Sequence, residues 1–281
     1  MQQVTVRVPA STSNLGPGYD CLGVALRLYN RVTVSRSFRP RGGAMAREAA
    51  RKFFERAGVA PSPLACAIEG DVPISRGLGS SVTVRLGVIL AANAIVGQPL
   101  SRQECFELCA HAEGHPDNAA PAAFGGFNII GDAGRQQFAV SPELRFVLLV
   151  PPFEVRTADA RHLLPKQINH HDAVTSCANA CAITAAFASG KYEAMRGAFS
   201  DRLHQPYRQP LIPFFGAVVA AAESAGALGA FLSGSGSTIA ALTIDHPEKV
   251  AHAMLEASGE KKARTIVTAA DNRGARIVEK Q

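Results

Sequence analysis

The first hydrophobic residues of the chain alternate with polar ones, because Val4, Val6 and Val8 occupy every second position. This period of two is typical of a strand with one buried face, and Pro9 is expected to end it. Residues 10–20 are rich in turn-forming types, and 21–35 again carries the pattern of one long strand or two. The chain is therefore predicted to begin with strands joined by a long turn.

Four segments of the first half carry apolar residues at helical spacing or the signals of a helix end. Gly58 is expected to stop the first helix, and Ser101 is a good N-cap for the third, with Glu104 at the capping-box position. The second helix is apolar over most of its surface, which predicts a central, buried position. The predicted helices cover 44–57, 80–96, 101–112 and 118–124.

The remaining elements follow the same two periods and mix without strict β–α–β alternation, which predicts an α+β protein. The proline pair at 151–152 is the clearest break and predicts two domains, residues 1–145 and 146–281. Further strands are predicted at 64–69, 127–130, 146–150, 228–232, 238–244, 264–268 and 275–279. Further helices are predicted at 157–163, 169–188, 191–199, 213–225 and 247–257.

Composition places limits on this picture. A chain of 281 residues with 47% hydrophobic content can bury one large core or two modest ones. The sequence has no apolar run long enough for a transmembrane helix and no signal-peptide pattern at its start, so a cytoplasmic protein is expected. Its six cysteines form no Cys-x-x-Cys pair and are expected to be reduced, mostly buried thiols. A helical zinc site from Cys105, Cys109, His111 and His115 is disfavoured, because glycine and proline interrupt the helix there.

The net charge of +6 is compatible with two kinds of anionic partner. Nucleic-acid binding usually needs clustered basic residues with aromatic or groove-reading elements, whereas here the charges are scattered and tryptophan is absent. A mild field that favours small anionic ligands such as nucleotides fits the composition better. Neither a nucleic acid nor a membrane is therefore expected as a partner.

The segment 73–81, Pro-Ile-Ser-Arg-Gly-Leu-Gly-Ser-Ser, stands directly before the long apolar helix. Gly77 and Gly79 allow backbone N–H groups to approach a polyphosphate, and the helix start offers unpaired N–H groups and a positive dipole end. The pattern predicts an anion site, although a glycine-rich turn capped by serines would share it. Neither the Walker A lysine nor the Rossmann glycine spacing is present.

Two further stretches flank this loop in the sequence: Pro-Ala-Ser-Thr-Ser-Asn-Leu-Gly-Pro-Gly-Tyr-Asp at 9–20 and Leu-Ser-Gly-Ser-Gly-Ser-Thr at 232–238. Together the three motifs resemble those of the GHMP kinase superfamily, over residues 4 to about 243. The resemblance implies a two-domain GHMP kinase fold, with an N-terminal part like domain 2 of ribosomal protein S5 and a C-terminal ferredoxin-like α/β sandwich. It also implies ATP as the phosphate donor. The residues it assigns to the nucleotide are Pro73, Arg76, Gly77, Leu78, Gly79, Ser80, Ser81 and Thr83.

Within the superfamily the chain resembles homoserine kinases, through its first motif, the segment Glu-Gly-His-Pro-Asp-Asn-Ala-Ala-Pro at 113–121, and the stretches 156–161 and 204–208. This implies phosphorylation of the L-homoserine hydroxyl, a step of threonine biosynthesis. Arginines suit an α-carboxylate, and carboxylate or amide oxygens suit an ammonium. Taken singly, such residues are more often surface arginines, turn residues or helix caps. The residues placed around the amino acid by the resemblance are Asn14, Asp20, Asn118, Arg161 and Arg208.

The resemblance further implies Mg²⁺ bridging the phosphates, with Ser81 and Glu113 as its protein ligands. Glu107, one to two helical turns earlier, is the alternative carboxylate. Thr157 resembles a family threonine near the phosphates. No clear general base is expected, so the substrate hydroxyl would lose its proton late, to phosphate.

The sequence departs from the family pattern between 35 and 47, where the chain is short. Family members carry an asparagine there that helps to hold adenine, and no asparagine stands between Asn30 and Asn93. Two alternatives therefore remain: a GHMP kinase for another small alcohol, and a catalytically silent nucleotide-binding protein. A homodimer is expected from the family.

Overall fold

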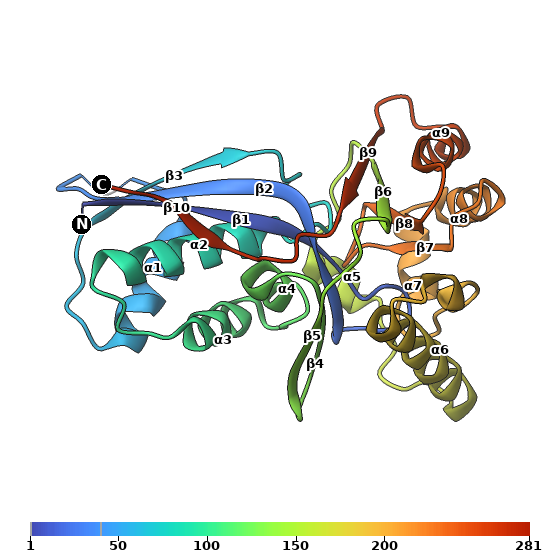
Figure 1. Cartoon of the computed structure of the whole chain (residues 1–281), viewed down its shortest axis with the longest axis horizontal. Coiled ribbons are helices and arrows are strands. Elements are labelled where there is room, and N and C mark those ends of the chain that lie inside the picture. The colour runs from blue at the N-terminus through green and yellow to red at the C-terminus, as the bar shows by residue number, and fades with distance from the viewer. Residues whose placement is uncertain (1, 40) are drawn as a thin grey trace.

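The computed structural model describes residues 2–39 and 41–281, which form two antiparallel sheets with helices packed around them (Figure 1). In the first sheet the strand order is β10-β1-β2-β4-β5, and β3 also pairs with β2. Its strands are β1 Gln3–Ser13, β2 Leu22–Arg36, β3 Leu64–Gly70, β4 Phe127–Gly131, β5 Gly134–Phe138 and β10 Arg276–Lys280. Five of these strands come from the first half of the chain, and β10 is its last element.

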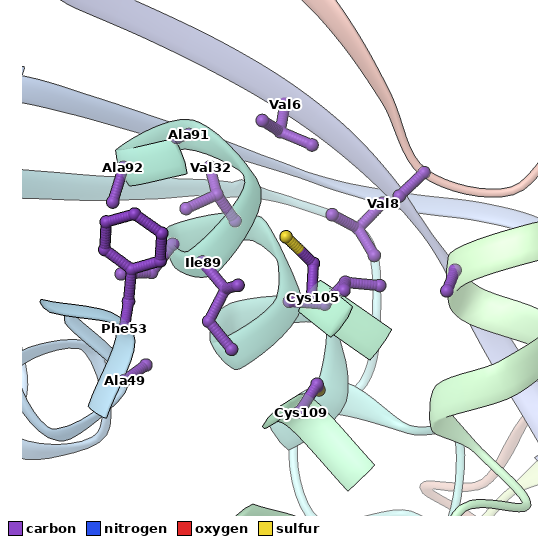
Figure 2. Packing of buried hydrophobic residues seen from close by; sticks show 14 of the residues in the cluster. Val6, Val8, Val32, Ala49, Phe53, Ile89, Ala91, Ala92, Cys105 and Cys109 are labelled. Atoms are coloured by element: carbon purple, nitrogen blue, oxygen red, sulfur yellow. The ribbon is translucent and has the colours of Figure 1, made fainter. Parts of the chain in front are cut away.

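Four helices cover one face of this sheet (Figure 1). They are α1 Ala44–Ala57, α2 Ser80–Ile95, α3 Arg102–Glu113 and α4 Ala119–Phe124. The alternation in β1 explains the packing, because Val6 and Val8 point to the helical side and are fully buried. Figure 2 shows these valines beside Phe53 of α1, Ile89 of α2 and Cys105 of α3. The apolar helix α2 lies centrally, as predicted.

The second sheet has the order β7-β8-β6-β9. Its strands are β6 Arg145–Val150, β7 Gly229–Leu232, β8 Ile239–Thr243 and β9 Arg264–Ala269. The helices of this half are α5 Thr157–His162, α6 His170–Ser189, α7 Gln205–Arg208, α8 Phe215–Ser224 and α9 Pro247–Ser258, with 3-10 turns at Tyr192–Met195 and Gln209–Leu211. Apolar residues of α8 and α9 pack on one face of the sheet, and residues of α6 belong to a different hydrophobic cluster.

One hydrophobic cluster contains residues of both sheets. Phe127 of β4 stacks on Phe187 of α6, with ring centroids 4.2 Å apart, and Phe146 of β6 belongs to the same cluster. Burying large aromatic rings in a shared core stabilises the contact between the two halves. Segments distant in sequence are thereby held together along the line where the sheets meet.

Most sequence predictions are confirmed, including the α+β class. The helix over 44–57 ends at Gly58 with the left-handed φ of 64° expected for a glycine cap. Ser101 and Glu104 form the predicted capping box, which starts α3 one residue later. The pattern over 21–35 corresponds to a single strand, β2.

Two predictions of elements need correction, and two elements were missed. Pro9 does not end β1, because a register shift between Pro9 and Ala10 lets the strand run on to Ser13, where Ser13 pairs with Gly23. A proline is tolerated at such an irregularity, since the ladder there lacks a regular hydrogen bond. The helix predicted at 191–199 is only a short 3-10 turn, and the hairpin strand β5 and the short helix α7 were not predicted.

The domain limits 1–145 and 146–281 stay a prediction, and the sheet topology departs from them at one strand. β10 pairs with β1, so the last strand belongs to the first sheet. In the described part of the chain no helix is both long and apolar enough to cross a membrane. The six cysteines are free, but only Cys105 and Cys109 are buried, while Cys177 and Cys181 on α6 are exposed.

Candidate functional site

A cavity of about 490 Å³ lies where the two halves meet, and it collects the sequence motifs. Its size is in the usual range for small-molecule sites. The cavity is lined by the first motif (residues 9–20), the central loop (residues 73–79), the start of α2, the turn before α4, helix α5 and the 233–238 loop. The polar or charged lining residues are Ser13, Asn14, Asp20, Ser75, Arg76, Ser80, Ser81, His115, Asp117, Asn118, Arg156, Thr157, Arg161, Arg208 and Ser235.

The central loop has the conformation that an anion site needs. Gly77 and Gly79 have φ values of 72° and 66°, and Gly79 is the residue before α2. Such left-handed dihedrals are open to glycine at little cost and turn successive N–H groups toward one side. Ser80 and Ser81 begin the helix, whose first-turn N–H groups and dipole favour a negative charge.

The 233–238 loop holds the central loop in place. Ser233 Oγ donates a hydrogen bond of 2.7 Å to the Gly77 carbonyl, and the Thr238 N–H donates to the Arg76 carbonyl at 3.2 Å. Thr12 and Ser233 hydroxyls lie 2.8 Å apart, which brings the first motif into the same network. The third motif therefore joins the other two and fixes the walls of the cavity.

Replacing Gly77 by alanine is expected to destabilise the protein by about 2–4 kcal/mol, more than a left-handed glycine usually contributes. A Cβ at Gly77 would lie 2.1 Å from the Ser233 carbonyl oxygen, a backbone atom that cannot move aside. Gly58→Ala is the matched control, because Gly58 has a similar φ of 64° but nothing within 4 Å of its Cβ position. Urea unfolding of both variants measures the difference, and equal losses would show that the close approach is unimportant.

Ser81 and Glu113 meet beside the start of α2. Ser81 Oγ donates a hydrogen bond of 2.8 Å to Glu113 Oε2, and the Glu113 side chain is 7% exposed. Glu107 lies one to two turns earlier on α3, where it accepts a hydrogen bond from Gln103 on the protein surface. A hydroxyl and a carboxylate in contact are oxygen donors of the kind that Mg²⁺ prefers. The geometry thus favours Glu113 over Glu107, although no group of three acidic, histidine or cysteine side chains suited to a metal occurs within residues 2–39 and 41–281.

Asp20 and Arg161 form a two-pronged ion pair in the cavity. Arg161 donates from Nη1 to Asp20 Oδ2 at 3.0 Å and from Nη2 to Asp20 Oδ1 at 2.8 Å. Arg161 Nη1 also donates to the Tyr19 hydroxyl at 2.9 Å, and the guanidinium of Arg208 lies 5.2 Å from the Tyr19 ring centroid. A negative and a positive side chain, the charges complementary to the two ends of an amino acid zwitterion, therefore lie side by side in the cavity.

Arg208 is almost completely buried and is held by backbone and imidazole acceptors. Its Nη1 donates to the Gly234 carbonyl at 3.0 Å and to His204 Nδ1 at 3.2 Å. His204 Nε2 donates to the Gly16 carbonyl at 2.8 Å, so the imidazole is neutral with its proton on Nε2. Burial lowers the pKa of His204 to about 4, and the charge of Arg208 acts in the same direction against the opposing effect of Asp201.

His204 is expected to make the protein lose stability as the pH falls. Because its folded-state pKa lies below the unfolded value of about 6.5, the unfolded chain binds the proton first, and the stabilisation present above that pH is lost as the pH falls toward 4. The loss between about pH 7.5 and pH 5 should be about 2 kcal/mol larger in the wild type than in His204→Gln. Urea unfolding at both pH values measures it. Equal losses in the two proteins would contradict the buried neutral histidine.

Two asparagines belong to the predicted clamp, the set of residues expected to surround the amino acid. Both form hydrogen bonds within the protein. Asn14 donates from Nδ2 to the Gly234 carbonyl at 3.0 Å and accepts from the Asp20 N–H at 3.0 Å. Asn118 accepts from Ser11 Oγ and donates to Ser13 Oγ, each at 2.8 Å. Both line the cavity and position neighbouring residues, and their contact with an ammonium group stays a prediction.

Several residues assigned to the nucleotide have other surroundings. Pro73, Leu78 and Thr83 do not line the cavity. Leu78 is fully buried, and Thr83 accepts a hydrogen bond of 2.8 Å from Asn30 in the core. Arg76 lies at the cavity, but its guanidinium donates to the carbonyls of Pro151 and Pro152, which fixes the central loop to the second half. Thr157 lines the cavity, 3.4 Å from the hydroxyl of Ser235 in the 233–238 loop, and its contact with a phosphate stays a prediction.

Sequence reasoning did not assign roles to Tyr19, His115 and Asp117, which lie in the motifs already quoted. His115 Nδ1 and Asp117 Oδ1 are 2.8 Å apart at the cavity wall. Burial disfavours charge on both groups, but their hydrogen bond outweighs it and holds the pKa of Asp117 below, and that of His115 above, the usual value. The available signal was the spacing His-Pro-Asp directly before the α4 cap.

One end of the cavity is apolar and opens to solvent. Ile68 of β3 and Ile74 of the central loop are 43% and 72% exposed and both line the cavity, and exposed apolar residues gathered at a cavity are typical of a ligand site. The other apolar residues that line the cavity are Met45, Ala46, Val82, Val84 and Val155. This end lies beside the region 35–47, where the family pattern has an asparagine and this chain has none.

Comparisons with known proteins agree with this geometry. The family models for the GHMP kinase N-terminal domain and the GHMP kinase C-terminal domain match residues 44–126 and 183–261. The homoserine kinase of Caldicellulosiruptor bescii is 38% identical over 99% of this chain and 98% of its own, and that of Moorella thermoacetica is 39% identical over 97% and 99%. The crystal structure of homoserine kinase from Cytophaga hutchinsonii superimposes with a TM-score of 0.89 at 25% identity, covering 99% of this chain and 98% of the other.

The three motifs meet in one cavity, the fold is the two-domain GHMP kinase fold, and the likeness extends over the full length of the relatives. The chain therefore belongs to the homoserine kinase family of the GHMP kinases.

Proposed function

We propose that this protein transfers the γ-phosphoryl group of ATP to the side-chain hydroxyl of L-homoserine, giving ADP and O-phospho-L-homoserine. The observation that carries the proposal is the Asp20–Arg161 ion pair, which shares one cavity with the glycine loop at the start of α2. An amino acid zwitterion can replace the contact between Asp20 and Arg161 with two of its own. Its ammonium then binds Asp20, and its carboxylate binds Arg161 and Arg208. Such a clamp also disfavours alcohols without the amino acid group, since they offer Asp20 and the two arginines no charged partner in place of the Asp20–Arg161 pair.

The nucleotide is placed by the central loop and the apolar end of the cavity. The polyphosphate lies against the N–H groups of Gly77 to Ser81, and the base packs between Ile68, Ile74 and the first turn of α1. Apolar packing then takes over part of the role that an asparagine has in relatives. Phosphoryl transfer depends mainly on such positioning and on charge neutralisation.

Ser81 and Glu113 would hold Mg²⁺, which neutralises phosphate charge when bound. The clamp directs the substrate hydroxyl at the γ-phosphorus, and Thr157, which lines the cavity, donates to a phosphate oxygen. Asp117 is already engaged by His115 and the Asn118 N–H, so the hydroxyl proton passes to an oxygen of the transferred group.

The proposal includes a cytoplasmic homodimer without nucleic-acid partners, which rests on the family resemblance and on the scattered basic residues. Light scattering on the purified protein measures its mass, and a monomer would contradict the dimer without affecting the activity.

A coupled assay of ADP release with Mg-ATP tests the activity against L-homoserine, L-threonine, L-serine, mevalonate and galactose. Turnover should be fastest on L-homoserine by at least about 10²-fold, the discrimination expected when a site binds polar groups of its substrate. Fast turnover on another alcohol would keep the kinase and discard the clamp. Binding of ATP without turnover on any of them would favour a silent nucleotide-binding protein.

A further inference from the structure

Arg85 lies on α2 one turn after Ser81 and contacts the same carboxylate. Its Nη1 donates to Glu113 Oε1 at 2.5 Å, whereas Ser81 Oγ donates to Oε2 at 2.8 Å. The two oxygens of Glu113 thus have different partners, one fixed by a guanidinium and one facing the hydroxyl at the start of the helix. Arg85 is part of none of the three motifs.

The surroundings of Arg85 argue against a role in stability alone. Its side chain is only 16% exposed, and its Nε is buried without a hydrogen-bond partner among the described residues. An unpaired buried donor costs free energy, and a buried ion pair often adds no net stability. Arg85 also contacts Glu48 on α1, at 3.4 Å. Because the Glu48 side chain is 40% exposed, this ion pair contributes little to stability.

We propose that Arg85 is a positioning residue that holds the Glu113 carboxylate with a single oxygen available to the metal beside Ser81. The inference rests on the proposed function, in which Glu113 and Ser81 hold Mg²⁺. An octahedral Mg²⁺ keeps several waters and takes carboxylate oxygens one at a time, so occupying Oε1 prevents the carboxylate from turning away or binding through both oxygens. Hydrogen bonds from outer residues commonly orient metal-binding carboxylates in this way.

The test measures metal affinity separately from turnover. Mn²⁺ binding to the enzyme–ADP complex is followed by electron paramagnetic resonance in the wild type, Arg85→Met, Arg85→Lys, Glu48→Gln and Glu113→Gln. Arg85→Met should weaken Mn²⁺ binding about 10-fold. Arg85→Lys should recover part of the affinity, because one donor can still reach Oε1, and Glu48→Gln should bind as the wild type does.

A purely structural role would lower the melting temperature of Arg85→Met but leave the Mn²⁺ affinity of the folded protein unchanged, which would overturn the proposal. Tighter binding in Arg85→Met would also overturn it, because Arg85 would then compete with the metal. If Arg85→Met does not fold, Arg85→Ala, which also lacks the donor to Oε1, decides between the same outcomes. Unchanged affinity in Glu113→Gln would instead refute the metal site itself, while loss in Glu113→Gln without loss in the Arg85 variants would refute only the role of Arg85.

Discussion

Asp20→Asn is expected to lower kcat/KM for L-homoserine by about 10²–10³-fold while ADP binding changes less than about twofold. The substitution keeps the shape of the side chain but removes the charge that faces Arg161 across 2.8 Å. An ammonium group then has no carboxylate partner, and the charge of Arg161 is left uncompensated in a partly enclosed site. Both effects weaken binding of the amino acid, and neither changes the central loop, where ADP is proposed to bind.

Steady-state kinetics measures the loss of kcat/KM, and calorimetric titration measures the affinity for ADP. Asp159→Asn is the matched control, because Asp159 lies exposed on α5, two residues from Arg161, and does not line the cavity. It should behave as the wild type does. Full activity in Asp20→Asn would remove the clamp from the account, and a parallel loss of ADP binding would indicate that the variant disturbs the whole cavity.

Glu113→Gln is expected to lower kcat by about 10²–10³-fold at fixed Mg²⁺ and to raise the Mg²⁺ concentration needed for half-maximal activity. The amide keeps a hydrogen bond to Ser81 possible but loses the negative charge that a hard cation requires. Titration of activity with MgCl₂ at constant ATP measures the effect.

Glu107→Gln is the matched control, since Glu107 lies on the same helix, is exposed, and has a side-chain hydrogen bond to Gln103 but none to Ser81. Its activity should stay within about twofold of the wild type, as for most surface substitutions. If the two variants lose activity equally, or if only Glu107→Gln does, the metal site has been assigned to the wrong carboxylate.

Helix and strand positions could be predicted where local signals are strong. The capping box at Ser101 and the glycine stop at Gly58 fixed the ends of α3 and α1, because these signals act over three or four residues. The extension of β1 beyond Pro9 was missed, since it depends on pairing with β2 and not on the local sequence. Long-range pairing likewise returns β10 to the first sheet.

The site could be predicted only as far as motifs carry family roles. Asp20 and Arg161 are 141 residues apart, and no local pattern indicates their contact; the family resemblance named both. That resemblance could not show that Arg76 is turned to the carbonyls of Pro151 and Pro152, because this depends on how the two halves pack. The hydrogen bond between Arg208 and His204 was not predicted, for the same reason.

The most direct test of the central claim is a competition in one reaction, in which the protein and Mg-ATP meet equal concentrations of L-homoserine, 4-hydroxybutanoate and 3-aminopropan-1-ol. The last two alcohols lack the ammonium and the carboxylate, respectively, and phosphorus NMR distinguishes the three products. If Asp20, Arg161 and Arg208 hold a zwitterion, O-phospho-L-homoserine should exceed each of the other products by at least about 10²-fold. Comparable amounts of any other phosphorylated alcohol would contradict the account.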